Sequence, residues 1–196
     1  MCVSAFPFLD SFLSYKYQMS AATPSSTVSS SSTAVEAFPS GAWTLYFHAP
    51  DDTTWTPASY IKLGTFTNFQ ALWGVLQRIG PAHFLTGMFF LMRDPFPPMW
   101  EHRSNINGGT YCVKVPEATA HETFQRYAAA SILDLATSDP RNTIVGISIS
   151  PKKGFHILKV WNNNCKTWNK PTELVILADG LRHADILYRP HVEQKF

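Results

Sequence analysis

Long apolar runs, paired cysteines and an excess of one charge are all missing from this sequence of 196 residues. No apolar stretch approaches the roughly 20 residues that a transmembrane helix needs, so we expect no membrane span. The three cysteines, Cys2, Cys112 and Cys165, are odd in number and far apart, without a CxxC pair. This spacing indicates neither a disulfide framework nor a zinc site. A reducing compartment fits best, and we expect a cytoplasmic protein.

Basic residues are also few for a protein that coats nucleic acid. The sequence has 16 Lys and Arg against 14 Asp and Glu, a formal net charge of +2. Proteins that bind RNA mainly by counterion release carry dense Lys and Arg. If RNA is the ligand, its contacts should therefore be local. Aromatic residues, in contrast, make up 14% of the chain and include six Trp, so most must be core and a few are free to bind.

The composition divides the chain into a tail and one domain. Residues 20–33 are nearly all Ser, Thr and Ala, which cannot bury enough apolar surface to offset the entropy lost on ordering. We therefore predict a mobile N-terminal tail with a Ser/Thr-rich linker over residues 1–37. The remaining residues, 38–196, are enough for one domain with its own core.

Short segments rich in β-branched and aromatic residues, bounded by Gly, Pro or Asn, predict seven strands. They are residues 43–48, 60–66, 85–93, 109–115, 143–150, 154–161 and 173–177. The turn between the fifth and sixth carries two lysines, which makes these two strands a hairpin with a basic tip.

Two amphipathic helices interrupt the predicted strands. Thr67 and Gln70 have capping-box spacing at the start of the first, which Gly80 and the following proline end. Thr119 and Glu122 have the same spacing at the start of the second, which we expect to continue to the next Asp-Pro pair. Helices grouped on one side of an antiparallel sheet make an α+β domain and leave the other face free to curve around a ligand.

Two tryptophans occur where a core does not require them. Trp55 lies in the polar loop 51–57 and Trp100 in the proline-rich loop 95–101. Taken alone, each reads as a loop anchor packed on the core. Two loop indoles that face each other would instead form a slot for one flat ring, and an indole face attracts a cation by about 0.5 to 2 kcal/mol. Because methylation at N7 gives guanine a positive charge, such a slot would prefer the methylated base.

Charged residues near these loops suit the rest of such a ligand. Glu101 directly follows Trp100, and its carboxylate can accept hydrogen bonds from N1–H and the exocyclic amine of guanine, although a solvated surface carboxylate is the alternative. Lys152 and Lys153 at the hairpin tip are the nearest cations for phosphates, although a charged turn is ordinarily only solvated. Trp161 reads either as a wall of the slot beside the N7 methyl group or as a core indole.

From about residue 38 the chain resembles the eukaryotic translation initiation factor 4E family, the cap-binding subunit of the initiation machinery. The matching pieces are Trp43-Thr-Leu-Tyr-Phe, Thr54-Trp55, the helix with Trp73, Arg93-Asp94, Pro98-Met99-Trp100-Glu101, Gly108-Gly109, Trp161 and His183-Ala184-Asp185. The resemblance implies a single curved antiparallel sheet with helices packed on its convex face and the cap slot on its concave face.

The resemblance also implies roles for the residues of the slot. Trp55 and Trp100 match the family's stacking residues, Glu101 its guanine-reading carboxylate and Trp161 its indole beside the methyl group. The family holds the cap phosphates on the hairpin that here carries Lys152 and Lys153. The ligand implied is capped mRNA.

A partner surface is implied on the helices. In the family, the tryptophan that matches Trp73 receives a helix from the scaffold subunit 4G or from 4E-binding proteins, and Phe69 and Leu133 would flank the same groove. An indole on an apolar helix face is otherwise ordinarily core. Ala129 and Ala130 stand where relatives have a larger apolar residue and an acidic one, which implies a reshaped groove and different partners.

Other departures from the family lie near the cap. Thr110 stands where relatives have an arginine after the Gly-Gly pair, so one phosphate-side cation is missing. Residues 162–170 replace a longer segment with a helix. Short, divergent isoforms of this kind occur in trypanosomatid protists, whose caps carry extra methyl groups, and a hypermethylated cap is thus a further candidate ligand. Tyr188, Arg189 and His191 would then flank the exit of the first nucleotides.

Three other functions compete with cap binding. The seven His come with no nucleophile motif and no metal-ligand spacing, so we predict no enzyme, no metal and no cofactor. A protein-interaction module or translational regulator of the same fold, with weak or vestigial cap binding, is the main alternative. A general binder of single-stranded RNA would need a basic track that the composition does not supply.

Overall fold

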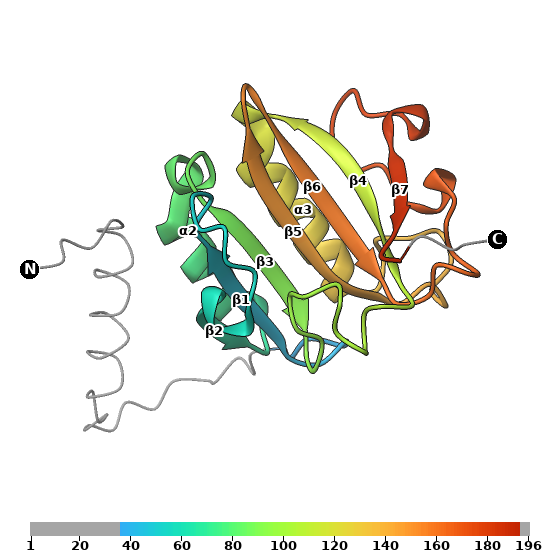
Figure 1. Ribbon diagram of the computed structural model, residues 1–196, viewed down its shortest axis with the longest axis horizontal. Helices are drawn as coiled ribbons and strands as arrows, with labels where there is room; N and C mark the ends of the chain where they lie inside the picture. The colour runs from blue at the N-terminus through green and yellow to red at the C-terminus, as the bar shows by residue number, and fades with distance from the viewer. Residues whose placement is uncertain (1–35, 193–196) are drawn as a thin grey trace, which may run out of the picture. The chain divides into compact units, whose positions relative to one another are not determined.

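A single seven-stranded antiparallel sheet organises the part of the chain that the computed structural model describes, residues 36–192 (Figure 1). The strands are β1 (Trp43–His48), β2 (Ile61–Phe66), β3 (Met88–Arg93), β4 (Gly109–Pro116), β5 (Ile144–Lys152), β6 (Phe155–Asn162) and β7 (Leu187–Pro190). Their order is β2-β1-β3-β5-β6-β4-β7, so the sheet is open with β2 and β7 at its edges. The tail predicted over residues 1–37 lies outside the described residues except for its last two, and it stays a prediction.

Two helices, α2 (Phe69–Phe84) and α3 (Ala120–Ile132), pack on one face of the sheet and against each other. Figure 1 looks onto the opposite face, with α3 visible behind β5 and β6. The structure therefore confirms the predicted α+β class, with one curved antiparallel sheet and its helices on one face. No helix among residues 36–192 is long and apolar enough to cross a membrane.

Alternation along the strands gives each face of the sheet its own apolar layer. On β4, Tyr111, Val113 and Val115 are fully buried, whereas Lys114 between them is exposed. The layer under the helices contains the largest fully buried side chains, among them Trp43, Tyr111, Tyr127, Phe84, Phe89 and Phe124. A smaller cluster contains Met88, Phe90, Met92, Val145 and Trp161, with Tyr46, Tyr60 and Phe96 packed against it. Phe89 and Phe90 are neighbours on β3 and belong to different layers, so the smaller cluster gives the helix-free face an apolar floor.

The C-terminal strand differs from the prediction. Residues 173–177 do not form a strand. Glu173 ends a 3-10 turn, Pro171–Glu173, and the residues after it are held to α3 because the Tyr127 hydroxyl donates to Val175 O at 3.0 Å. Their only ladder contact in the described structure is an isolated bridge from Leu174 to Thr137. The true edge strand is β7, whose four residues are mostly exposed and show no clear alternation of apolar and polar residues.

The helix ends also differ from the predicted capping boxes. The N-cap of α2 is Asn68, whose side chain accepts the Ala71 N–H at 2.9 Å. The helix is interrupted at Gly80, as predicted: its φ of 62° and ψ of 169° are not helical, and a second, short helical segment follows from Pro81 to Phe84. At α3 the Thr119 hydroxyl donates to the Pro116 carbonyl and caps no helix amide. This helix ends at Ile132, earlier than predicted, because Asp134 adopts a left-handed conformation with φ 55°.

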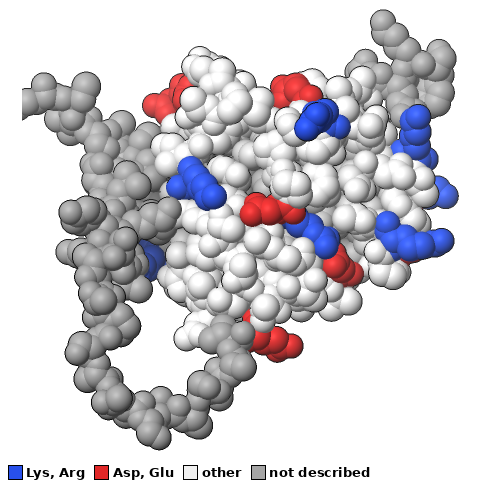
Figure 2. All heavy atoms as spheres, turned by 90° about the horizontal axis from the view of Figure 1, so that it is seen from below, with Lys and Arg blue, Asp and Glu red and all other residues white. Residues whose placement is uncertain are grey.

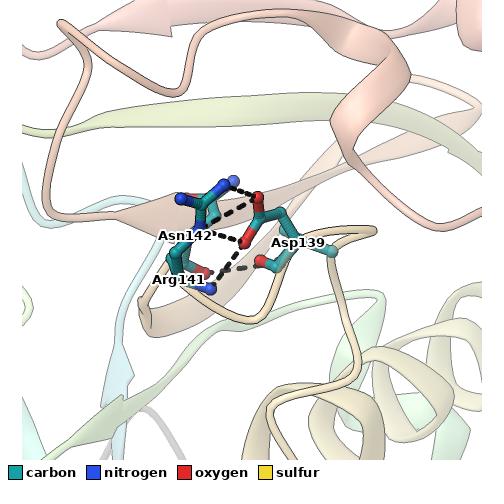
Figure 3. A network of polar contacts seen from close by, with 4 residues as sticks. Asp139, Arg141 and Asn142 are labelled. Carbon is teal, nitrogen blue, oxygen red and sulfur yellow. Dashed lines mark hydrogen bonds and ion pairs between the residues drawn. The ribbon is translucent and has the colours of Figure 1, made fainter.

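A local polar cluster closes the connection from α3 to β5 (Figure 3). Arg141 donates to the Asp139 carboxylate from Nε at 3.0 Å and from Nη2 at 2.6 Å. The hydrogen bonds from Arg141 lower the pKa of Asp139 to about 2. The Arg141 guanidinium also lies over the ring of Trp168. Asp139 and Arg141 thus connect this turn to the short segment 163–170.

Asn142, labelled in the same view, extends into a buried network. Its Nδ2 donates to the Tyr111 hydroxyl at 2.9 Å, and its Oδ1 accepts from Asn162 Nδ2 at 3.1 Å. Asn162 Nδ2 also donates to the carbonyl of Trp168 at 2.9 Å. These bonds fix the segment 163–170 on the sheet without an α-helix in it.

Candidate functional site

One cavity on the helix-free face gathers four of the residues predicted for the slot. It has a volume of about 320 Å³ and is lined by Trp55, Tyr60, Phe90, Pro98, Trp100, Glu101, Ser148, Ser150, Lys159 and Trp161. This volume is in the range of small-ligand sites, about 300 to 1,000 Å³. Trp55, Trp100, Glu101 and Trp161 come from separate loops and a strand, and the fold brings them to this one cavity, which we call the slot.

Trp55 is supported from behind by a histidine. Its indole is 51% exposed and stacks on the fully buried ring of His48, with the ring centroids 4.1 Å apart and the planes within 8° of parallel. The ring nitrogens of His48 lie 2.8 Å and 3.3 Å from the carbonyl oxygens of Ala49 and Thr54. One face of Trp55 is therefore covered, and much of the rest of the indole is open to a ligand.

Trp100 belongs to a loop that a buried asparagine holds together. The indole is 45% exposed. Asn105 is fully buried, and its Nδ2 donates to the carbonyl oxygens of Pro97 and Met99, both at 2.8 Å. Because Met99 directly precedes Trp100, these bonds fix the backbone from which the indole projects. Asn105 was not among the predicted site residues, since neither its spacing nor its neighbours distinguish it from a surface residue.

The negative charge of Glu101 affects the pKa of a tyrosine that lines the slot. Burial, followed by the negative charge of Glu101, raises the pKa of Tyr60 to about 12. The Tyr60 hydroxyl therefore stays protonated at neutral pH. Glu101 itself is exposed at the rim, so its carboxylate oxygens are available to donors of a bound ligand.

Trp161 is both a core residue and a wall of the slot. It is only 4% exposed, and its Nε1 donates to the Ser148 hydroxyl at 3.0 Å. Its ring meets Phe90 and His191 edge to face, at centroid distances of 6.5 Å and 5.0 Å. The two interpretations left open by the sequence are therefore compatible.

The cations near the slot differ in part from those predicted. Lys159 lines the slot and also a second hollow of about 370 Å³, where Lys152, Lys114 and Arg189 join it. Lys153 is exposed in the turn and lines neither of these two hollows. Lys159 was not among the predicted site residues, although it lies two residues before Trp161 on one strand and therefore on the same face.

Charges elsewhere do not form a basic track on the face that Figure 2 shows. Lys and Arg side chains lie there singly or in small groups, with acidic side chains between them. Among residues 36–192, no three His, Cys, Asp or Glu side chains are placed to hold a metal ion.

The residues predicted for a partner surface fall into two places. Phe69 and Trp73 on α2 are half-buried, and their rings pack edge to face at 5.2 Å. Leu133 is 41% exposed and lines a different hollow, beside Leu135 and residues 176–181. Neither Phe69 nor Trp73 lines that hollow.

Of the three C-terminal residues predicted near the emerging nucleotides, Arg189 lines the second hollow beside Lys159. Tyr188 points to the other face, where its hydroxyl donates to Asn162 Oδ1 at 2.9 Å and its ring packs on Tyr111. His191 packs against Trp161. The prediction for Tyr188 is wrong because successive side chains of a strand point to opposite faces of the sheet, and that of Tyr188 points into the buried network.

Comparisons with known proteins agree with this architecture. Residues 40–193 match the family model of eukaryotic initiation factor 4E. Eukaryotic translation initiation factor 4E-1 of Schizosaccharomyces pombe is 25% identical over 157 residues, which are 77% of this chain and 69% of that protein. This is a family of initiation factors and not of enzymes, as the sequence analysis predicted.

Solved structures share the fold at lower identity. The complex of Ascaris suum eIF4E-3 with m7G cap matches with a TM-score of 0.55 and 18% identity, over 63% of this chain and 72% of that one. The Schistosome eIF4E complexed with m7GpppA and 4E-BP matches with a TM-score of 0.57 and 19% identity, over 64% of this chain and 71% of that one. With a family model matching most of its length, the chain belongs to the eukaryotic initiation factor 4E family.

Proposed function

We propose that this protein binds the 7-methylguanosine cap of mRNA and acts in translation initiation through a scaffold partner in the cytoplasm. The observation that carries the proposal is that two exposed indoles, Trp55 and Trp100, line one cavity together with Glu101. Relatives of the same fold were solved with m7G cap and with m2,2,7G cap, which supports a methylated guanine, including a hypermethylated one, as the ligand.

In the proposed complex the methylated base lies between the indoles of Trp55 and Trp100. Stacking on an aromatic side chain contributes roughly 1 to 3 kcal/mol per base. The positive charge of the base adds a cation–π attraction that neutral guanine lacks. Trp161, at the inner wall, contacts the N7 methyl group. The apolar floor under the slot suits a methyl group better than the bare N7 of unmethylated guanine, an acceptor that would lose its hydrogen bond to water.

Glu101 reads the edge of the base. Its carboxylate accepts hydrogen bonds from N1–H and the exocyclic amine, two donors that adenine does not offer. Hydrogen bonds to a charged acceptor contribute about 1.5 to 3 kcal/mol. The Tyr60 hydroxyl stays protonated because burial and the charge of Glu101 raise its pKa. It is therefore a further hydrogen-bond donor for the Glu101 carboxylate or for the ligand.

The phosphates leave the slot along β6 in this proposal. Lys159 borders both hollows, so we assign it the phosphates next to the base. Lys152 follows in the second hollow, and Lys153 in the exposed turn contributes only at longer range. Thr110 is 6% exposed and carries no charge, so Lys159 takes over part of the role of the arginine that relatives have there.

A 4G-like scaffold or a 4E-binding protein is proposed on the helical face. Phe69 and Trp73 present a half-buried aromatic pair on α2, and an amphipathic helix can lay its apolar face on such a pair. Leu133, in its separate hollow, would contact a second part of the same partner. Related folds were solved with the 4E-binding protein Mextli and with 4E-BP, which supports this class of partner.

Tryptophan fluorescence tests the proposal directly. We expect 7-methyl-GTP to quench the emission of the full chain with micromolar or tighter affinity, and GTP to bind at least tenfold more weakly because it lacks the positive charge. Equal affinities would contradict the cation-selective slot. If neither nucleotide binds while a helical 4E-binding peptide does, the protein is an interaction module of the same fold with a vestigial slot.

A further inference from the structure

We propose that His191, just beyond β7, is a positioning residue that holds the Trp100 loop (residues 94–108) in its binding geometry only while its imidazole is neutral. Cap affinity should therefore fall on mild acidification. The inference rests on the proposed function for its binding readout, but the contact between His191 and the loop can be tested without any ligand.

The C-terminal segment is attached to the Trp100 loop at two points. The backbone N–H of His191 donates to the carbonyl of Gly108 at 2.9 Å. Its ring Nδ1 lies 2.7 Å from the carbonyl oxygen of Asn105. Because a carbonyl only accepts hydrogen bonds, Nδ1 carries the proton in this arrangement. The opposite side of the ring packs edge to face on Trp161, the inner wall of the slot, at 5.0 Å.

Asn105 transmits this attachment to the stacking indole. Its side chain donates to the carbonyls of Pro97 and Met99, and its own carbonyl receives the His191 ring. The connection therefore runs from His191 through Asn105 to the residue directly before Trp100. His191 touches no part of the proposed ligand in this scheme and acts through the loop.

The other ring nitrogen makes the contact sensitive to protonation. Nε2 of His191 is buried and has no hydrogen-bond partner among the described residues. An unpaired acceptor is tolerable in a neutral ring, but protonation would bury an N–H bearing a positive charge without an acceptor. Two charged groups face the ring: Lys159 from β6, which opposes protonation, and Glu101 from the Trp100 loop, which favours it.

Burial has the larger effect and lowers the pKa of His191 below its usual 6.5, with Lys159 adding to the shift and the Asn105 carbonyl and Glu101 opposing it. A released His191 is solvated and takes up a proton near its ordinary pKa of about 6.5. The contact is therefore at full strength above that value. It weakens as the pH falls from there toward the lower pKa of the docked ring.

Two substitutions distinguish the effect of the hydrogen bond from His191 to Asn105 from the effect of protonating the His191 ring. His191→Asn retains an N–H donor near the position of Nδ1 but cannot be protonated. His191→Phe retains a ring against Trp161 and has no donor. His183→Asn is the matched control, because His183 is exposed and its Nε2 also lies 3.0 Å from a backbone carbonyl, that of Leu174, but it does not line the slot.

The first measurement is the affinity for 7-methyl-GTP between pH 8 and pH 5.5. At pH 8 we expect wild type and His191→Asn to agree within about twofold and His191→Phe to bind about fivefold more weakly, as for one lost hydrogen bond. On acidification wild type and His183→Asn should lose about fivefold relative to His191→Asn. Parallel pH profiles for wild type and His191→Asn would overturn the proposal.

The second measurement needs no ligand. Hydrogen exchange of the amides of residues 97–108 at one fixed neutral pH should accelerate in His191→Phe and stay near wild type in His191→Asn. Unchanged exchange in His191→Phe overturns the positioning role whatever the nucleotide titrations show. If wild type binds no cap analogue at any pH, the proposed function fails, and exchange alone decides on His191. Should His191→Phe not fold, the His191→Asn pH profile remains decisive.

Discussion

The two loops that carry the exposed indoles are held in different ways. Trp55 rests on a ring stack with His48, and its loop adds local bonds such as the one from Thr54 N–H to Asp52 Oδ1 at 2.7 Å. Trp100 is held by directional hydrogen bonds through Asn105, which are tied in turn to the far end of the chain. One loop is fixed by neighbours in sequence, the other by a long-range network.

This difference matches what each loop must do in the proposed site. Aromatic pairs occur offset-stacked or edge to face over centroid distances of about 4.5 to 7 Å, so a stacking surface tolerates a range of positions. Hydrogen bonds to a base edge need alignment within tens of degrees. The Trp100 loop carries Glu101 as well as an indole, so it requires fixed geometry, whereas the Trp55 loop has only to present a flat surface.

The largest effect should follow loss of either indole. Trp55→Ala or Trp100→Ala removes a stacking contribution of roughly 1 to 3 kcal/mol and a cation–π attraction of up to about 2 kcal/mol. We expect the affinity for 7-methyl-GTP to fall about 100-fold in each variant, the equivalent of roughly 3 kcal/mol, with an unchanged circular dichroism spectrum. Trp73→Ala, an indole on α2, is the control and should bind normally. Retention of binding within threefold by both slot variants would refute the slot.

Asn105→Ala should have the next largest effect and act through the loop. It removes two hydrogen bonds and leaves the carbonyls of Pro97 and Met99 without that donor, which costs roughly 1 to 3 kcal/mol of unfolding free energy. We also expect about tenfold weaker cap binding, because the Trp100 loop loses its fixed geometry. Urea unfolding and fluorescence titration measure the two effects. Asn107→Ala, an exposed asparagine of the same loop, should be near wild type; equal losses in both would point to a general loop effect.

His48 variants test whether Trp55 needs only a flat support. His48→Phe retains a ring under the indole and loses both polar contacts, whereas His48→Ala loses the ring as well. An aromatic pair contributes about 0.5 to 1.5 kcal/mol beyond burial. We therefore expect about fivefold weaker binding of 7-methyl-GTP for His48→Ala and less than twofold for His48→Phe. A His48→Phe variant as weak as His48→Ala would show that the hydrogen bonds, and not the stack, hold this loop.

The features that could be predicted from the sequence were those that depend on the residue types within one short segment. Six of the seven predicted strands lie where predicted, because these segments are rich in β-branched and aromatic residues and are bounded by Gly, Pro or Asn. Trp55, Trp100 and Glu101 were noticed because indoles in polar or proline-rich loops are unusual. Lys159 could also have been found, since strand alternation alone places it on the same face as Trp161.

The supports of the slot were not predictable in this way. His48 reads as a strand residue and Asn105 as a loop residue, and their roles come from contacts that only the folded chain makes. His191 contacts a residue 86 positions away. β7 pairs with β4 across a similar separation in sequence, and its four mostly exposed residues show no alternation of apolar and polar residues that would predict a strand. Residues 173–177 have strand-like composition, but their backbone bonds to Tyr127 of α3 and to residues 136–138 and not to a strand of the sheet.

The smallest expected effect is a coupling, and it decides whether the two loops are independent. His48 and Asn105 share no interaction among the contacts described for them, so the losses of unfolding free energy in His48→Ala and Asn105→Ala should add in the double variant within about 0.5 kcal/mol. Cap affinity should behave differently. Both indoles enclose one base, so displacing one leaves less for the other to contact, and the double variant should lose less affinity than the sum of the single losses. The opposite result would be that the losses of cap affinity add and the losses of unfolding free energy do not. The two loops would then be one structural unit, and the base would contact each indole independently.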